Sequence, residues 1–145
     1  DTGGAGRWRG GNAARRTYKG GFEQATCTVI AERGRGAPKG LFNGLSGATF
    51  NSSIERGSGE TKTLRAKSEQ EIIAKGDRVR IQPAGGGGYG DPLERPADDV
   101  WSDVIDGYVS AESAERDYGV VVSDGRLDPG ATDALRHQLR AHRIG

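Results

Sequence analysis

The sequence predicts a mainly β fold with glycine-rich segments of the polyproline-II type, followed by a small helical C-terminal tail. Glycine supplies 25 of the 145 residues, far above the ~7% that is usual in globular proteins. Short stretches of alternating apolar and polar residues occur before Pro92, and apolar residues at helical spacing follow it. We therefore expect a glycine-rich β/polyproline-II region over residues 1–96 and a helical tail over residues 97–145, packed as one domain.

The glycines recur at intervals of three or four residues in several parts of the chain. A polyproline-II helix has three residues per turn, so this spacing places glycines on one side of an extended segment. Two interpretations are open: a flexible low-complexity tract, or backbone packed closely against backbone or against a partner. Aromatic residues between the glycines favour close packing. The glycines expected at such contacts are Gly40, Gly44, Gly47, Gly85, Gly86, Gly87, Gly88 and Gly90.

Strands are expected on both sides of a long loop. Residues 12–32 are typical of two strands joined by a hairpin turn at Gly20-Gly21. Residues 33–53 contain many glycines and predict the loop. The stretch DRVRIQP then alternates cleanly, with Val79 and Ile81 on the inward face.

Three helices are expected in the tail. Apolar residues at helical spacing in PADDVWSDVIDGYVS indicate the first. Ser110 is a favourable N-cap for the second helix, and Gly119 is a favourable stop. Asp128 is expected to cap the third, with Pro129 at its first position. The expected apolar contacts of this last helix are Leu135, Leu139 and Ile144.

Charge and hydropathy argue against several classes of protein. Twenty-one basic residues against 20 acidic ones give a net charge of +1, so no strong field for nucleic acid or anionic membrane is expected. A glycine-rich RNA-binding module is therefore disfavoured. No apolar run has the length of a signal peptide or membrane span, which predicts a soluble, cytoplasmic protein. The single cysteine, Cys27, lies in a strand-like stretch and is expected to be an inert thiol.

The run of four glycines before Tyr89 does not match a phosphate-binding loop. A P-loop needs a lysine and a hydroxyl residue after its last glycine, and neither is present. Gly85, Gly87 and Gly90 fit a dinucleotide-binding spacing, but the βαβ context is missing. His137 and His142 have no carboxylate or cysteine beside them that would complete a metal site. The sequence therefore predicts no catalytic, cofactor-binding or metal-binding residue in this chain.

Four stretches, taken in order, resemble the C-terminal end of subunits of the hydantoinase B/5-oxoprolinase family. They are DTGGAGRWRGG, KGLFNGLSG, KGDRVRIQPAGGGGYGDPLERP and DVIDGYVSAESAERDYGVVV, and they cover nearly the whole chain. The resemblance implies barrel-like β-sheets that run into glycine-rich polyproline-II segments. On this interpretation the four glycines serve packing, because such segments bundle closely only where Cβ atoms are absent.

The usual subunit of this family is several times longer than 145 residues. The resemblance therefore implies a split-off structural, non-catalytic subunit, similar to the small beta subunit of acetophenone carboxylase. ATP-dependent carboxylation of an aromatic ketone would be performed by the whole complex, with ATP and a divalent metal on other subunits. The alternative is a part of an ATP-dependent hydantoinase or 5-oxoprolinase.

The implied partners are a larger hydantoinase-B-like subunit and kinase-like ATP-binding subunits in a hetero-oligomer. A chain that is 33% hydrophobic is not expected to bury enough apolar surface by itself. Large aromatic residues among the glycines are the expected contacts with the partner, because obligate interfaces are hydrophobic. These residues are Trp8, Phe22, Phe42 and Tyr89.

Overall fold

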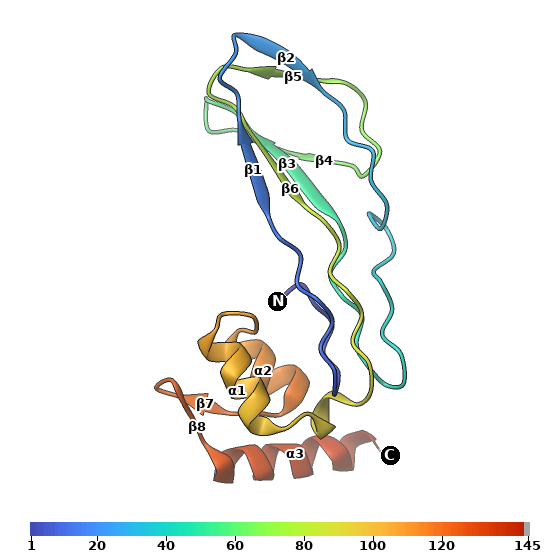
Figure 1. Ribbon diagram of the computed structural model, residues 1–145, viewed down its shortest axis with the longest axis vertical. Helices are drawn as coiled ribbons and strands as arrows, with labels where there is room; N and C mark the ends of the chain where they lie inside the picture. The colour runs from blue at the N-terminus through green and yellow to red at the C-terminus, as the bar shows by residue number, and fades with distance from the viewer. Residues whose placement is uncertain (144–145) are drawn as a thin grey trace.

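A computed structural model describes residues 1–143 of the chain. The molecule is elongated, with most strands at one end and the helices, with a short two-stranded sheet beside them, at the other (Figure 1). The strands are β1 (Arg16–Lys19), β2 (Gln24–Cys27), β3 (Asn51–Glu55), β4 (Thr61–Leu64), β5 (Glu71–Ala74), β6 (Arg78–Gln82), β7 (Val122–Ser123) and β8 (Arg126–Leu127). The helices are α1 (Ala97–Ile105), α2 (Ala111–Tyr118) and α3 (Pro129–Arg143), preceded by a 3₁₀ turn at Pro92–Glu94.

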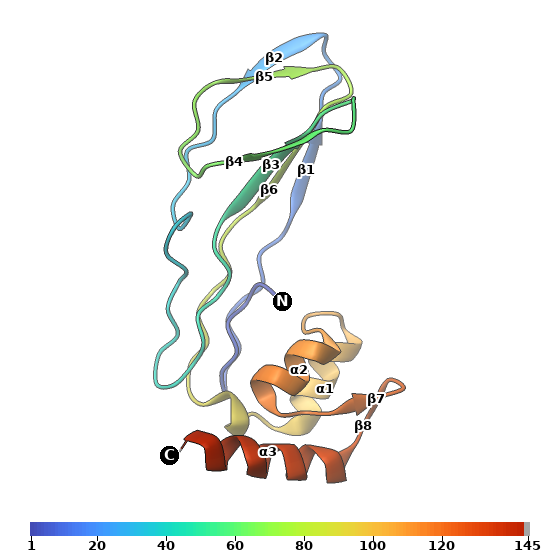
Figure 2. The same cartoon turned by 180° about the vertical axis from the view of Figure 1, so that it is seen from behind.

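The fold is mixed rather than mainly β, because 24% of the residues are helical and 25% lie in strands. The sheets are open and do not close into a barrel, which corrects that part of the sequence prediction. One antiparallel sheet has the order β1-β6-β3-β4, so that β1 and β4 are its edges. The strands β2 and β5 form a second sheet that lies over the first (Figures 1 and 2). The polyproline-II assignment and the division near residue 96 stay predictions.

The predicted hairpin at Gly20-Gly21 is wrong. Strands β1 and β2 do not pair with each other, because β1 pairs with β6 and β2 pairs with β5. The two glycines instead lie where this antiparallel ribbon bends from one sheet into the other. At the bend, the Gly20 amide donates to the Asp77 carbonyl, and the Gly76 amide donates to the Gly20 carbonyl. The glycine pair thus marks a change of direction, but the partner strands lie more than forty residues away in sequence.

The strands enclose a small hydrophobic core between the two sheets. Its buried members are Val29, Ile54, Leu64, Ile73 and Val79, with Ile81 packed against them. The inward orientation predicted for β6 is thus confirmed. Strand β3 begins inside the stretch that was expected to be a loop. It was missed because serine and asparagine open it, although Ile54 is fully buried.

Helix α1 ends at Ile105, before the end of the stretch in which it was expected, whereas α2 and the start of α3 have the predicted capping residues. The Ser110 hydroxyl accepts a hydrogen bond from the Ser113 amide at 3.1 Å, and Gly119 ends α2 in the left-handed conformation at φ 61°. The Asp128 carboxylate accepts from the Ala131 amide at 2.9 Å, as expected for an N-cap of α3. Leu135 and Leu139 are half-buried, and Ile144 lies outside the described residues.

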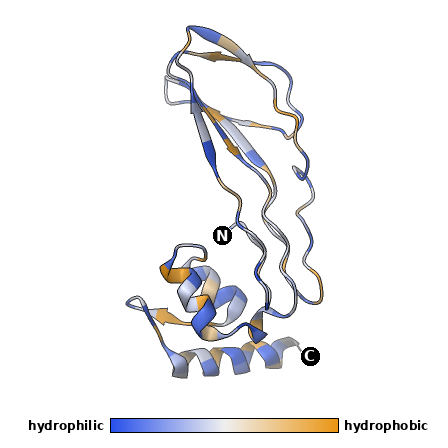
Figure 3. Ribbon diagram, viewed as in Figure 1, coloured by the Kyte–Doolittle hydropathy of each residue, from blue (hydrophilic) through white to orange (hydrophobic). Residues whose placement is uncertain are grey.

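A second core joins the helices to the N-terminal segment. It contains Ala5 together with Val100, Val109, Ala114, Tyr118 and Val120. Hydrophobic and hydrophilic residues both occur along the helices, whereas the extended segments are mostly of intermediate hydropathy (Figure 3). No helix within residues 1–143 is long and apolar enough to cross a membrane.

Asp77 stabilises the bend between the two sheets. Hydrogen bonds from the amides of Ala74 and Gly57, and the Arg56 guanidinium at 2.9 Å, hold the pKa of the Asp77 carboxyl below its usual value. A lowered pKa in the folded state means that this stabilisation is fully present above about pH 4. It is lost as the pH falls through the folded-state pKa.

We therefore expect Asp77→Ala to lower the thermal midpoint near neutral pH, because two backbone amides and one arginine lose their acceptor. The difference from wild type should shrink as the pH falls below about 4. Thermal unfolding of the chain, kept soluble by a fusion partner, from pH 3 to pH 7 measures both effects. Glu60→Ala, at an exposed turn position, is the matched control. A wild-type–variant difference that is the same at every pH would contradict this role.

Candidate functional site

Three glycine-rich stretches lie side by side between the sheets and the helices (Figures 1 and 2). We call residues 2–11, 38–48 and 84–90 the glycine bundle. Backbone hydrogen bonds join all three: the Leu45 amide donates to the Ala5 carbonyl at 2.7 Å, and the Leu41 amide to the Gly88 carbonyl at 2.9 Å. The Gly4 amide donates to the Gly86 carbonyl at 2.8 Å. The bundle is thus held by backbone groups rather than by side chains.

Most glycines of the bundle have backbone atoms where a side chain would begin. A Cβ added at any of the following positions would lie closer than 3.0 Å to a backbone atom of the bundle: Gly40, Gly44, Gly47, Gly85, Gly87 and Gly88. The same holds at Gly3, Gly4, Gly6 and Gly10, which were not among the expected contacts. Gly86 has its nearest neighbour at 3.1 Å, and Gly90 adopts φ +77°.

The four-glycine run has few free amide groups to offer an anion. The amides of Gly85, Gly86 and Gly88 donate to the carbonyls of Ala48, Gly11 and Leu45, at 3.0, 2.9 and 2.9 Å. A phosphate-binding loop uses such amides to hold the ligand. Here three of the four already have backbone acceptors.

We expect that this chain neither binds nor hydrolyses ATP. The run has no following lysine or hydroxyl residue, and its amides are occupied within the bundle. Calorimetric titration of Mg-ATP into the chain, kept soluble by a fusion partner, should give no heat of binding. Micromolar binding that is abolished by substitution of Gly86 or Gly87 would contradict this expectation.

One edge of the glycine bundle carries an exposed cluster that we call the aromatic patch: Trp8, Leu41, Phe42 and Tyr89. Trp8 and Tyr89 exchange backbone hydrogen bonds at 2.9 Å, and the rings of Phe42 and Tyr89 lie 5.0 Å apart. The exposed fractions are 65% for Trp8, 71% for Phe42 and 49% for Tyr89. Phe22, also 46% exposed, lies at the bend between β1 and β2 and is not part of this cluster.

The turn that carries Phe42 has an unfavourable backbone. Phe42 and Asn43 have φ values of 49° and 70°, and the Gly44 amide donates to the Leu41 carbonyl at 3.0 Å to close the turn. A bulky residue in the left-handed region is rare and costs free energy. The fold therefore tolerates strain at a position whose side chain is exposed. Such an outlier is a reason to look for a contact outside the chain.

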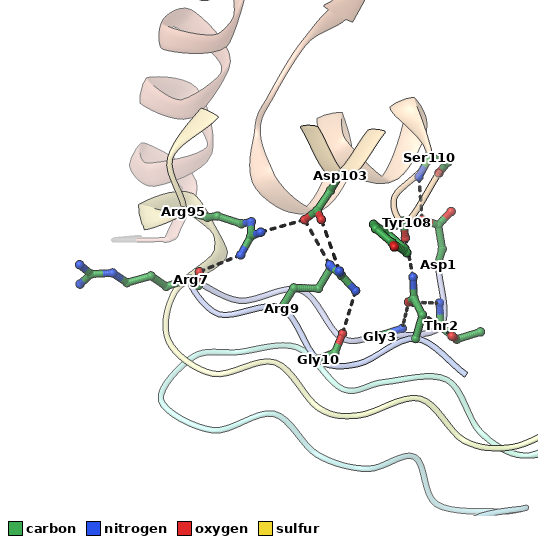
Figure 4. Close-up of polar contacts among 11 residues, drawn as sticks. Asp1, Thr2, Gly3, Arg7, Arg9, Gly10, Arg95, Asp103, Tyr108 and Ser110 are labelled. Carbon is green, nitrogen blue, oxygen red and sulfur yellow. Dashed lines mark hydrogen bonds and ion pairs between the residues drawn. The ribbon is translucent and has the colours of Figure 1, made fainter. Parts of the chain in front are cut away.

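A buried ion-pair network joins the N-terminal segment to the helices (Figure 4). The Asp103 carboxylate on α1 accepts hydrogen bonds from Arg9 Nε at 3.2 Å and from Arg95 at 2.9 Å. The side chains of Arg9, Arg95 and Asp103, the arginine–aspartate network, are only 17%, 14% and 11% exposed. Within residues 1–143 the Nε of Arg95 has no hydrogen-bond partner.

Polar contacts around the network attach the first residues of the chain (Figure 4). The Asn12 side chain accepts from the Gly3 amide at 2.7 Å and donates to the Tyr108 carbonyl at 2.8 Å. The Ser110 amide donates to the Asp1 carboxylate at 2.7 Å. No local pattern in the sequence indicated the contacts with Tyr108 and Ser110, because their partners are about a hundred residues away.

Tyr118 is the buried ionisable side chain beside this network whose pKa is shifted. Burial raises the pKa of Tyr118 to about 12, against the opposing fields of Arg95 and Arg9. The Tyr118 hydroxyl is therefore protonated at neutral pH and is not a base. Among residues 1–143, no three histidine, cysteine, aspartate or glutamate side chains are grouped to hold a metal ion. The network thus joins the N-terminal segment to α1 through charged side chains.

Comparison with known proteins identifies the family. Residues 1–92 match the family model for hydantoinase B/oxoprolinase. The chain belongs to this family. It is 36% identical over 145 residues to the caprolactamase beta subunit of Pseudomonas jessenii, and 32% identical over 133 residues to the B component of a putative D-/L-hydantoinase from a Pseudomonas species. It is also 36% identical over 85 residues to the acetone carboxylase alpha subunit of Xanthobacter autotrophicus, which covers 55% of the chain.

Solved structures show the same architecture in this family. A nucleotide-free acetone carboxylase superposes with a TM-score of 0.85 at 24% identity over 99% of the chain, which establishes the shared fold. The ATP-dependent caprolactamase of Pseudomonas jessenii superposes with a TM-score of 0.83 at 33% identity over 94% of the chain. In both cases the chain spans 24% of the solved polypeptide. The caprolactamase and hydantoinase relatives are likewise matched over only 24% and 22% of their length.

Proposed function

We propose that the chain is a structural, non-catalytic part of an ATP-dependent enzyme of this family, and that it completes a larger hydantoinase-B-like polypeptide. The main support is the aromatic patch. Its large side chains are exposed around a strained turn, as expected of an interface that becomes buried on assembly. The match to about a quarter of the relatives' length agrees with a partial unit.

The reaction that we propose for the whole complex is ATP-dependent carboxylation of a ketone, of the type that converts acetophenone, bicarbonate and ATP to benzoylacetate. The similarity to the acetone carboxylase alpha subunit supports this reaction. A second candidate is ATP-dependent hydrolysis of a hydantoin, oxoproline or lactam ring. It is supported by the caprolactamase and hydantoinase relatives, whose alignments cover 94% and 90% of the chain.

In this proposal ATP and a divalent metal bind to kinase-like subunits of the complex, and neither binds to this chain. A cytoplasmic location, where ATP is available, belongs to the same proposal. We expect this chain to bind neither nucleic acid nor a membrane. ATP hydrolysis by the assembled complex, measured with acetophenone plus bicarbonate or with a hydantoin, oxoproline or lactam, separates the two reactions. The true substrate should be the compound that stimulates ATP hydrolysis by the complex.

Expressed alone, the chain is expected to aggregate or to show poor protection of its amides from hydrogen exchange. Its two cores are small, and the aromatic patch exposes apolar surface to water. Co-expression with the larger hydantoinase-B-like polypeptide should restore a soluble complex. Size-exclusion chromatography and hydrogen exchange measure the outcome. A monodisperse monomer with cooperative melting would refute the obligate-subunit proposal.

A further inference from the structure

A cavity of about 990 Å³ opens where strands β3 and β4 separate. The paired residues of β3 and β4 end with Ser52 opposite Leu64. Beyond this pair, the Phe50 amide donates to the Arg33 carbonyl at 3.0 Å, and the Ala31 amide donates to the Ala66 carbonyl at 2.7 Å. The segment 31–36 thus spans the gap between the two diverging strands and closes one side of the cavity.

Four cationic side chains line this basic cavity, against one acidic side chain: Arg33, Arg35, Arg65 and Lys67 against Glu32. The whole chain has a net charge of only +1, so the cavity concentrates positive charge locally. Within residues 1–143 the three arginines make no ion pair with an acidic side chain, and Lys67 lies 4.0 Å from the Glu32 carboxylate. Other arginines of the strand region, such as Arg56 and Arg80, do have carboxylate partners.

The rim of the cavity is held in a strained backbone conformation. Arg33 adopts φ 61°, which is unusual for a long side chain. A Cβ added at the next residue, Gly34, would lie within 3.0 Å of the Ala66 Cβ, so the segment presses against the strand that follows β4. Strain of this kind persists where surrounding contacts enforce it and is concentrated at binding sites. Here it places two arginines, Arg33 and Arg35, at the mouth of one cavity.

The floor of the cavity is apolar. Leu64 is buried in the strand core, and Phe50 packs against the same core and lines the cavity. The three arginines are exposed and come from two separate segments of the chain, residues 33–35 and residue 65. Exposed cations on separate segments differ from the fixed bidentate donors that hold a single phosphate. The arrangement suits an extended chain with an apolar side chain between acidic ones, and β4 offers a free sheet edge beside it.

We propose that the basic cavity docks an acidic segment of the larger hydantoinase-B-like polypeptide, with an apolar side chain of that segment on Phe50 and Leu64. The inference rests on the proposed function, since it names the chemistry by which that partner is recognised. Unpaired arginines opposite carboxylates accelerate association and fix the register of the two chains. The docking is thus expected to depend on salt concentration.

The test uses the larger polypeptide and the chain kept soluble by a fusion partner, either as wild type or charge-reversed at Arg35→Glu with Arg65→Glu. The matched control reverses two exposed cations outside the cavity, Lys19→Glu with Arg126→Glu. We expect the cavity variant to bind the larger polypeptide roughly 10-fold or more weakly in ~0.1 M salt, mainly through slower association. The control should bind as wild type does. Surface plasmon resonance at several salt concentrations provides both rates.

A photo-crosslinking residue in place of Thr63, which lines the cavity without contributing charge, identifies the occupant. Crosslinks should map to a peptide of the larger polypeptide that carries net negative charge. Failure of the wild-type chain to form any complex contradicts the proposed function itself. Formation of a complex that both variants join equally well, or crosslinks to a neutral or basic peptide, overturns only the docking inference. Micromolar binding of inorganic phosphate that the cavity variant loses, with assembly unchanged, would assign the cavity to a small anion instead.

Discussion

Gly87→Val is expected to prevent correct folding or assembly of the chain. A Cβ at Gly87 would lie closer than 3.0 Å to the carbonyl group of Lys39 and to the amide of Gly40, all backbone atoms of a neighbouring segment. Backbone cannot rotate away as a side-chain tip can, so two segments of the bundle must separate. We expect a loss of more than ~3 kcal/mol, at the upper end of overpacking effects. That loss corresponds to a fall in Tm of roughly 10 °C for a domain of this size.

The reason for the loss at Gly87 is close approach and not backbone conformation. Neither Gly87 nor Gly44 has a positive φ, whereas Gly90 does. Gly44→Val should be similarly disruptive, because its Cβ would meet the backbone of Gly88 and Tyr89. Gly11→Val is the matched control, since a Cβ there has no atom within 4 Å. If Gly87→Val and Gly44→Val assemble with the Tm of the Gly11 variant, the bundle is a loose linker.

Local sequence patterns predicted the parts of the fold that depend on local chemistry. The Ser110 hydroxyl accepts from an amide of the helix that it begins, and Gly119 adopts the left-handed conformation that ends this helix. The alternation of apolar and polar residues in β6 likewise predicted its buried face, which contains Val79. Each of these sequence patterns involves only a few neighbouring residues. Each could therefore be recognised without knowledge of the rest of the chain.

Features that depend on distant partners were wrong or missing in the sequence predictions. The pair Gly20-Gly21 indicates a bend equally well whether the next strand returns along the first or crosses to another sheet. The resemblance to the hydantoinase B family was confirmed, but the barrel that it implied was not, since β1 and β4 are open edges. Three of the four predicted interface aromatics gather in one place, and Phe22 does not, because spacing along the chain gives no information on proximity in space.

The arginine–aspartate network could not be predicted, and it supports the second large effect that we expect. Asp103→Ala would leave the guanidinium groups of Arg9 and Arg95 buried beside each other without a counter-ion. Removal of one partner from a buried ion pair costs about 3–5 kcal/mol, because the remaining charge has lost both water and its partner. Arg95 is especially sensitive to this effect, since its Nε already lacks a hydrogen-bond partner within residues 1–143.

The consequence reaches beyond α1, because Arg9 belongs to the glycine bundle and Asp103 to the helical tail. We expect Asp103→Ala to lower the Tm of the co-purified complex by roughly 10 °C or more. It should also increase hydrogen exchange in residues 2–11. Asp106→Ala, one residue beyond the same helix and exposed, is the matched control and should change neither measurement.

The double variant Asp103→Ala with Arg95→Met should recover part of the lost stability, because it removes one unpaired charge and leaves an apolar side chain of similar length. If the double variant is less stable than Asp103→Ala alone, the cost arises from lost packing and not from the uncompensated charge.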